Sequence, residues 1–250
     1  MKRASAPSIG MTTPRSRVAE LASSIQIRNG LLAAGAALAY FALGLPLIAL
    51  PLGPHAVHMA SHILLMNTLA PVLASTIIAS FGDRAPGFAS ARVLIAATVL
   101  QLALLWTWHA PNFWGPVLRE PLVHVLMQAS LLAASLTFWL AILSEKGVVR
   151  WRGVVALLAT GKFSCLLGVL LLFAPRLLYA DAHVGHGQVM SDGDELLADQ
   201  RLAGLLMLIA CPFCYVLAGI AIAAKWLQEL ETTARGRSLA CLDHAPPTPR

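Results

Sequence analysis

The chain has 250 residues and a mass of 26.5 kDa, the size of one or two ordinary domains. Its composition is 58% hydrophobic and 12% charged, about half the charged share of a typical soluble protein, and its mean hydropathy is +0.72. These values argue against a soluble enzyme, a secreted disulfide-bonded scaffold and a disordered regulator. The formal net charge of +6 therefore needs a membrane explanation before a nucleic-acid one.

The first thirty residues form a basic N-terminal tail. They carry five Lys or Arg residues against a single acidic residue, Glu20, with Ser, Thr and Pro scattered between them. This tail is too long and too interrupted for a cleaved signal peptide, so we expect the apolar run that follows to stay in the mature chain. We predict a tail over 1–30, a helical membrane domain over 31–224 and a second tail over 225–250.

Six apolar runs follow the N-terminal tail, and Lys162 is the only charged residue inside them. Most of the runs exceed the ~18 residues that cross a bilayer as a helix. Pro51 and Pro54 close the first run, because proline does not continue a helix. The sequence therefore predicts an all-α, polytopic transmembrane bundle of about six spans. The predicted spans are 31–50, 56–80, 93–108, 122–143, 153–175 and 202–224.

Basic residues are divided unevenly between the two sets of segments that connect these spans. The set that includes both termini holds 14 Lys or Arg residues, whereas the opposite set holds only Arg119, Arg176 and Arg201. By the positive-inside rule, we expect both termini to be cytoplasmic. The basic excess then marks orientation and contact with anionic lipid, and it requires no nucleic acid.

Seven of the eight histidines fall at or near the predicted outer face. The second span begins with His55, His58 and His62, whose spacing places the three imidazoles on one face of the helix. Met59 lies beside them, and Met66 continues the stripe one turn deeper. We expect His62 ~10 Å below His55, at a depth where ionisable residues usually face the bundle interior and mark function. Imidazole and thioether ligands suit copper; interfacial histidines that only bond loop carbonyls are the alternative.

Two neighbouring segments bring further imidazoles to the same level. His109 follows the aromatic end of the third span, which Pro111 stops, and His124 opens the fourth span with Met127 on the same face. Both side chains are therefore expected at the outer membrane surface. Spacing alone does not indicate whether they face the same cavity as the stripe on the second span.

The segment over 176–200 is the only long external loop that we predict. It is acidic and carries His183 and His186, so it should attract cations, although a plain solvated loop is the alternative. Asp199 lies where this loop enters the last predicted span. A carboxylate is favoured by the dipole at a helix N-terminus, and it can also orient a ligating histidine.

Three of the four cysteines lie inside predicted spans. Cys211 and Cys214 form a Cys-x-x-Cys pair, but the pair sits within a membrane helix and lacks the βαβ setting of a redox motif. Cys165 is expected at a similar depth. We expect all three thiols to act as small packing residues, with a buried thiol set on the path of a soft metal as the alternative.

Between about residue 31 and residue 224, several short segments occur in the same order as the motifs of a known protein family. They are His58-Met59-Ala60-Ser61-His62-Ile63-Leu64-Leu65-Met66 with Ala70-Pro71, Trp108-His109-Ala110-Pro111, His124 with Phe138-Trp139, Leu178-Tyr179, and Asp199-Gln200-Arg201-Leu202-Ala203-Gly204. Together they resemble CtaG, a family of integral-membrane assembly factors for caa-type cytochrome c oxidases. That family often has about seven spans, and Cys211, Cys214, His183 and His186 lie outside the motifs that carry the resemblance.

The resemblance implies a multi-pass protein of the bacterial plasma membrane that contacts haem-copper oxidase subunits and helps their maturation, by delivering or inserting copper. We predict a non-catalytic, metallochaperone-like factor, because the sequence has no nucleophile and base pair, phosphate-binding glycine loop or paired catalytic carboxylates. Its copper site should face the periplasm or exterior. The predicted ligands are His58, His62, Met59, Met66, His109 and His124, with His55, His183, His186 and Asp199 as weaker candidates.

Two other functions stay open from the residues alone. A copper or other cation transporter would need polar steps through the whole bilayer, and Cys165, Cys211 and Cys214 would have to form its middle site. A membrane b-type cytochrome normally needs histidines near both faces, whereas the inner halves of the six spans contain none. A haem held on the outer side by His62 and His124 is the remaining form of that alternative.

Overall fold

The computed structural model describes residues 30, 34–35, 52–81, 88–179 and 193–243, and they are helical apart from short connections. Five of the described helices are long and apolar enough to cross a membrane. The all-α prediction is thus confirmed, while most of the first predicted span, 31–50, lies outside the described residues. The five are Pro54–Ser80, Ala91–Trp108, Pro121–Ser144, Gly147–Phe173 and Gly193–Gly236.

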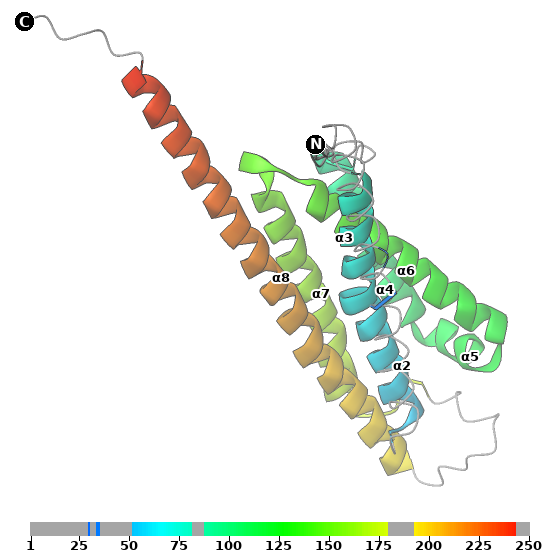
Figure 1. Ribbon diagram of the computed structural model, residues 1–250. Coiled ribbons are helices and arrows are strands. Elements are labelled where there is room, and N and C mark those ends of the chain that lie inside the picture. The colour runs from blue at the N-terminus through cyan, green and yellow to red at the C-terminus, as the bar shows by residue number, and fades with distance from the viewer. Residues whose placement is uncertain (1–29, 31–33, 36–51, 82–87, 180–192, 244–250) are drawn as a thin grey trace, which may run out of the picture.

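The first of these spans is one continuous rod made of three pieces (Figure 1). Helix α2 (Pro54–Leu64) leads into a π-helical turn, η1 (Leu65–Leu69), and then into α3 (Ala70–Phe81). Pro54 occupies the first turn of α2, where proline's missing N–H has no helical partner to lose. The rod therefore begins close to its predicted boundary, with the histidines in its first three turns.

Pro71 explains the π-helical turn in the middle of this rod. Proline has no N–H to donate, and its ring collides with the carbonyl of the preceding turn in a regular α-helix. A π turn shifts that carbonyl aside. The Met66 carbonyl then accepts hydrogen bonds from Ser135 Oγ and Trp139 Nε1, each over 3.0 Å. The local defect thus fastens the first rod to α6.

Helices α4 (Ala91–Trp108), α5 (Pro111–Arg119) and α6 (Pro121–Ser144) follow in a compact arrangement. Ser90 caps α4 by accepting a hydrogen bond from the Val93 N–H over 3.2 Å. Prolines open both α5 and α6, which is the position that proline favours. The aromatic segment after α4 is therefore the short helix α5, lying across one end of α6 (Figure 1).

Helices α7 (Trp151–Phe173) and α8 (Gly193–Asp243) run side by side (Figure 1), and glycines allow the close approach. A Cβ placed on Gly204 would lie 2.6 Å from the Leu172 nitrogen and 2.8 Å from the Gly168 carbonyl oxygen. Small residues at such contacts are typical of membrane helix pairs. Helix α8 is longer than the predicted 202–224 at both ends, so Asp199 lies inside the helix rather than at its mouth.

The described bundle exposes apolar side chains and buries polar ones. Phe173 and Phe213 are 72% and 63% exposed on the outer surface of their helices, whereas His55 and Gln101 are 1% and 0% exposed. A lipid environment favours this pattern because large apolar groups can face hydrocarbon and polar groups find partners inside the bundle. The protein is therefore a multi-pass membrane protein whose polar chemistry lies in its interior.

Candidate metal centre

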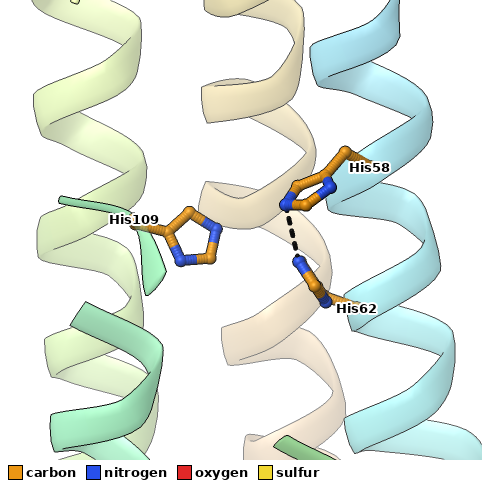
Figure 2. A group of neighbouring side chains, drawn as sticks. All are labelled: His58, His62 and His109. Carbon is orange, nitrogen blue, oxygen red and sulfur yellow. Dashed lines mark hydrogen bonds between the residues drawn. The ribbon is translucent and has the colours of Figure 1, made fainter. Parts of the chain in front are cut away.

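Three buried imidazoles meet where α2 passes the end of α4. His58 and His62 are one turn apart on the same face of α2, and His109 is the first residue after α4. All three rings point toward one another (Figure 2), and each residue is at most 5% exposed. We call these three residues the imidazole triad. Helical spacing supplies two of its members, and the folded bundle brings the third.

The nitrogen atoms of the triad lie nearly close enough to share one ion. His58 Nε2 lies 2.8 Å from His62 Nε2, and one ligand nitrogen from each of the three residues lies within 4.8 Å of the others. Two nitrogens that bind one ion at about 2 Å lie at most about 4 Å apart. A small inward movement of the rings would therefore let all three bind the same metal ion.

The third imidazole is held in a fixed tautomer. His109 Nδ1 donates a hydrogen bond to the Leu105 carbonyl over 2.7 Å, which leaves the lone pair on Nε2. That nitrogen lies 3.3 Å from the Met59 sulfur. Burial lowers the pKa of His109 to about 4, although the bond to Leu105 opposes the shift, so the ring is neutral at pH 7. A neutral imidazole beside a thioether is a donor pair that fits copper.

Aromatic rings cover the triad. The Trp114 ring of α5 stacks on Tyr179 with centroids 4.4 Å apart and meets the edge of His58 at 4.5 Å. The Tyr179 hydroxyl donates to the His109 carbonyl over 2.9 Å. Burial raises the pKa of Tyr179, so this donor stays protonated. Trp114 is 1% exposed, and the cover therefore keeps bulk water away from the imidazoles.

Asp199 of α8 binds the first turn of α2 rather than a member of the triad. Its carboxylate accepts hydrogen bonds from the backbone N–H groups of His55 (2.8 Å) and Ala56 (3.2 Å), and His55 Nδ1 donates to it over 2.9 Å. His55 also stacks on Trp114, with ring centroids 5.1 Å apart. A Cβ on Gly53 would overlap the Asp199 carboxylate, so only glycine leaves room for this contact.

The remaining predicted ligands are distributed around the triad. Met66 is buried and lines a cavity that also touches Met59, His62 and His109. His124 is half-buried, and its ring centroid lies 6.2 Å from that of His58, outside the group whose nitrogens converge. His183 and His186 lie outside the described residues. The structure thus brings four of the six main candidates close together, namely His58, His62, His109 and Met59. A fifth, Met66, lines the cavity beside them.

A comparison with protein families supports the same interpretation. The family described as cytochrome c oxidase caa3 assembly factor (Caa3_CtaG) matches residues 15–229, which is most of the chain. This chain belongs to the CtaG family. The resemblance that the motifs indicated is therefore confirmed. Searches of curated proteins and of solved structures find no match to this CtaG protein.

Several residues around the CtaG site were not predicted from the sequence as site residues. Trp114 and Tyr179 form the aromatic cover, Gly53 admits Asp199, and Gln128 Nε2 donates to Ser61 Oγ over 3.3 Å beside the triad. Gly53 stands between two prolines and Tyr179 lies in a family motif, so the sequence contained a hint that each of these two residues matters. Trp114 could be recognised only once α5 was known to fold over α2.

Proposed function

We propose that this CtaG protein holds a copper ion at the imidazole triad and passes it to an oxidase subunit during maturation of a haem-copper oxidase. The observation that carries the proposal is the convergence of three buried imidazoles, from α2 and the end of α4, beside the Met59 thioether. Membership of an oxidase assembly factor family supports the choice of an oxidase subunit as the recipient. The copper is cargo, so the ion arrives and leaves in each round.

The donor set suits a cargo that must be released. Neutral imidazoles and a thioether bind copper without placing a negative charge beside it, which leaves the ion available to a stronger site with thiolate or carboxylate ligands. Trp114 and Tyr179 cover the ion from water, and a movement of α5 would open the triad to a partner. No bond-making step is required, and we assign the protein no catalytic activity.

We further propose that the triad faces the periplasm or exterior of a bacterial plasma membrane, with both termini in the cytoplasm. The uneven division of basic residues supports this orientation through the positive-inside rule. The triad, Asp199 and Tyr179 all lie at one end of the described helices, so this orientation exposes the whole centre to the same compartment. That compartment is where an oxidase subunit with an external copper centre would accept the ion.

The geometry does not favour a b-type cytochrome. His58 and His62 are in direct contact over 2.8 Å, and the cavity beside them has a volume of about 20 Å³, room for about one water molecule. A porphyrin would have to displace most of the side chains that line it. His124 lies beside His58 rather than across a flat slot from His62.

A substitution in cells tests the proposal. His62→Ala removes a ligand outright, so the loss of copper affinity should exceed the ~10- to 100-fold loss expected for a partner that only orients a ligand. We expect oxidase activity to be lost while the His62→Ala protein still accumulates in the membrane, with partial rescue by added copper. His124→Ala is the matched control, because it removes an imidazole outside the triad. Full oxidase activity in the His62→Ala strain would refute the proposal.

A further inference from the structure

A small cavity extends from the imidazole triad into the bundle, and sulfur atoms line its deeper part. Its volume is about 20 Å³. His62 and His109 contribute to its wall near the triad, whereas Met66, Met207 and Cys211 contribute from η1 and α8. Met207 and Cys211 are four residues apart, so they share one face of α8. Two thioether residues and one thiol residue from two helical segments therefore line the same cavity.

The depth of this sulfur set follows from the register of α2 and α8. His55 contacts Asp199 and Asn67 contacts Cys211, and each pair is separated by 144 positions in the sequence. The two helices therefore run parallel and in register from one contact to the other. Asn67 lies five residues beyond His62, which places Cys211 about 7 Å deeper than the triad along the helix axis.

A polar contact orients the thiol. Asn67 Nδ2 donates to Cys211 Sγ over 3.6 Å, and no partner for the buried Asn67 Oδ1 is found within the described part of the chain. His62 is 97% buried and borders the same cavity. An unpaired buried polar atom is costly in a protein interior. The Asn67 Oδ1 atom, on a residue that lines the cavity with three sulfur-bearing side chains, therefore points to a ligand rather than to simple packing.

Tyr215 lies at the inner end of the cavity, one turn beyond Cys211 on α8. The Tyr215 hydroxyl accepts a hydrogen bond from Gln101 Nε2 over 3.1 Å, and its ring stacks on Trp139 with centroids 6.2 Å apart. Tyr215 is 2% exposed and forms the floor beneath Cys211. An ion in the cavity would have the triad on one side and these packed aromatic rings on the other, an arrangement that fits a holding site better than a path across the membrane.

We propose that Met66, Met207 and Cys211 form a second site, below the triad, for a soft monovalent cation such as Cu(I). This inference rests on the proposed function, because the ion reaches the cavity from the triad. Thioether and thiolate sulfur are ligands that select Cu(I). Packing was the main expectation for Cys211, with a soft-metal thiol as the alternative, and its place in the cavity wall favours that alternative. Cys214 is not among the residues that line the cavity, so it keeps the packing role.

Charge is balanced within the site. Binding replaces the thiol proton by the ion, so Cu(I) and Cys211–SH give a neutral Cu(I)–thiolate and one proton released to bulk water, with no change of oxidation state. A neutral complex suits a membrane interior, where an uncompensated cation is costly. No carboxylate lines the cavity and Lys162 on α7 is exposed, so in the described bundle the thiolate is the compensating charge.

The full-length protein in detergent, titrated anaerobically with Cu(I) against a chromophoric Cu(I) chelator, tests the site. Wild type should bind two ions, and one of them should give an ultraviolet thiolate-to-copper charge-transfer band. Cys211→Ser should bind one ion and lose the band, whereas the matched control Cys214→Ser should keep both. His58→Ala/His62→Ala should keep the band. Met207→Leu, which preserves volume, should weaken the same ion and serves if Cys211→Ser does not accumulate.

The failures of the two proposals are distinguishable in this experiment. A wild-type protein that binds one ion without a thiolate band would overturn the second site and leave the triad intact. An unchanged band in Cys211→Ser would also overturn it. A wild-type protein that binds no Cu(I) would overturn the second site, and one that also binds no Cu(II) would overturn the proposed function itself.

Discussion

Asp199, in the second turn of α8, is the residue that joins this helix to the beginning of α2. It bonds two backbone N–H groups and the His55 ring, so one carboxylate sets the register of the two helices that carry most of the candidate ligands. The orphan N–H groups of a helix start are a natural partner for a carboxylate. Here the carboxylate comes from a neighbouring helix. The contact depends on Gly53, where a side chain would occupy the same space.

Gly53→Ala should therefore displace the Asp199 carboxylate. Overfilling a packed site typically lowers the free energy of unfolding by about 1–3 kcal/mol, and loss of the helix register should also weaken copper binding at the triad. The midpoint of thermal unfolding in detergent and the copper affinity are the two measurements. Gly115→Ala on α5 is the control, because a Cβ there meets no neighbour within 4 Å. Equal behaviour of the two variants would show that the Asp199 contact does not position α2.

The imidazole triad illustrates what residue patterns can and cannot predict. His58 and His62 were identified by spacing, because residues four apart on a helix are neighbours. His109 and His124 were both predicted to complete the site, but spacing alone could not show which of them faces His58 and His62, since contacts between helices depend on how the bundle packs. From its sequence position His124 was as good a candidate ligand as His109. Only the packed bundle shows that His109 belongs to the triad and His124 does not.

At the scale of elements, the π-helical turn is the feature that hydropathy does not reveal. It lies inside an uninterrupted apolar run, and Pro71 is its only local signal. The hydrophobic runs did predict the long helices α4, α6 and α7 to within a few residues, because membrane spans depend on apolar length. The end of α8 was not predictable in this way, since the helix continues as a polar segment beyond the apolar run.

The Met66 carbonyl permits a double-mutant cycle. Ser135→Ala and Trp139→Phe each leave it one donor, so each change alone should cost little beyond lost packing. The double variant leaves a buried carbonyl unsatisfied, and we expect an additional loss of about 1–3 kcal/mol in the free energy of unfolding. Unfolding of the four proteins in detergent measures the coupling. Trp151→Phe is a control for removal of an exposed tryptophan. Strict additivity would mean that the carbonyl does not need both α6 donors.

At the scale of the whole molecule, the described helices gather their functional groups at one end of the bundle. The triad, the Asp199 contact and the aromatic cover all lie there. The opposite end holds an ion pair between Arg150, at the start of α7, and Glu229 of α8, over 2.7 Å. The sequence alone predicted this polarity from the positions of histidine and of basic residues. It could not supply the aromatic cover, because Trp114 and Tyr179 come from segments separated by a whole span pair.

Reporter fusions test the proposed orientation. A periplasm-dependent phosphatase fused after Arg250 should be inactive, and one inserted near Gly187 should be active, because the positive-inside rule places the C-terminus in the cytoplasm. A cytoplasm-dependent reporter at the same two points is the control and should give the opposite pattern. The reverse result for both reporters would place the triad on the cytoplasmic side and exclude delivery to an external copper centre.

The most direct test of the central claim is copper binding by the purified protein. Wild type and His58→Ala/His62→Ala are titrated with copper under controlled redox conditions, and X-ray absorption identifies the ligands of the bound ion. We predict imidazole nitrogen around copper in wild type, with loss of that nitrogen-bound ion in the double variant while the helical content is unchanged. A double variant that binds copper with the same affinity and the same nitrogen coordination as wild type would contradict the account.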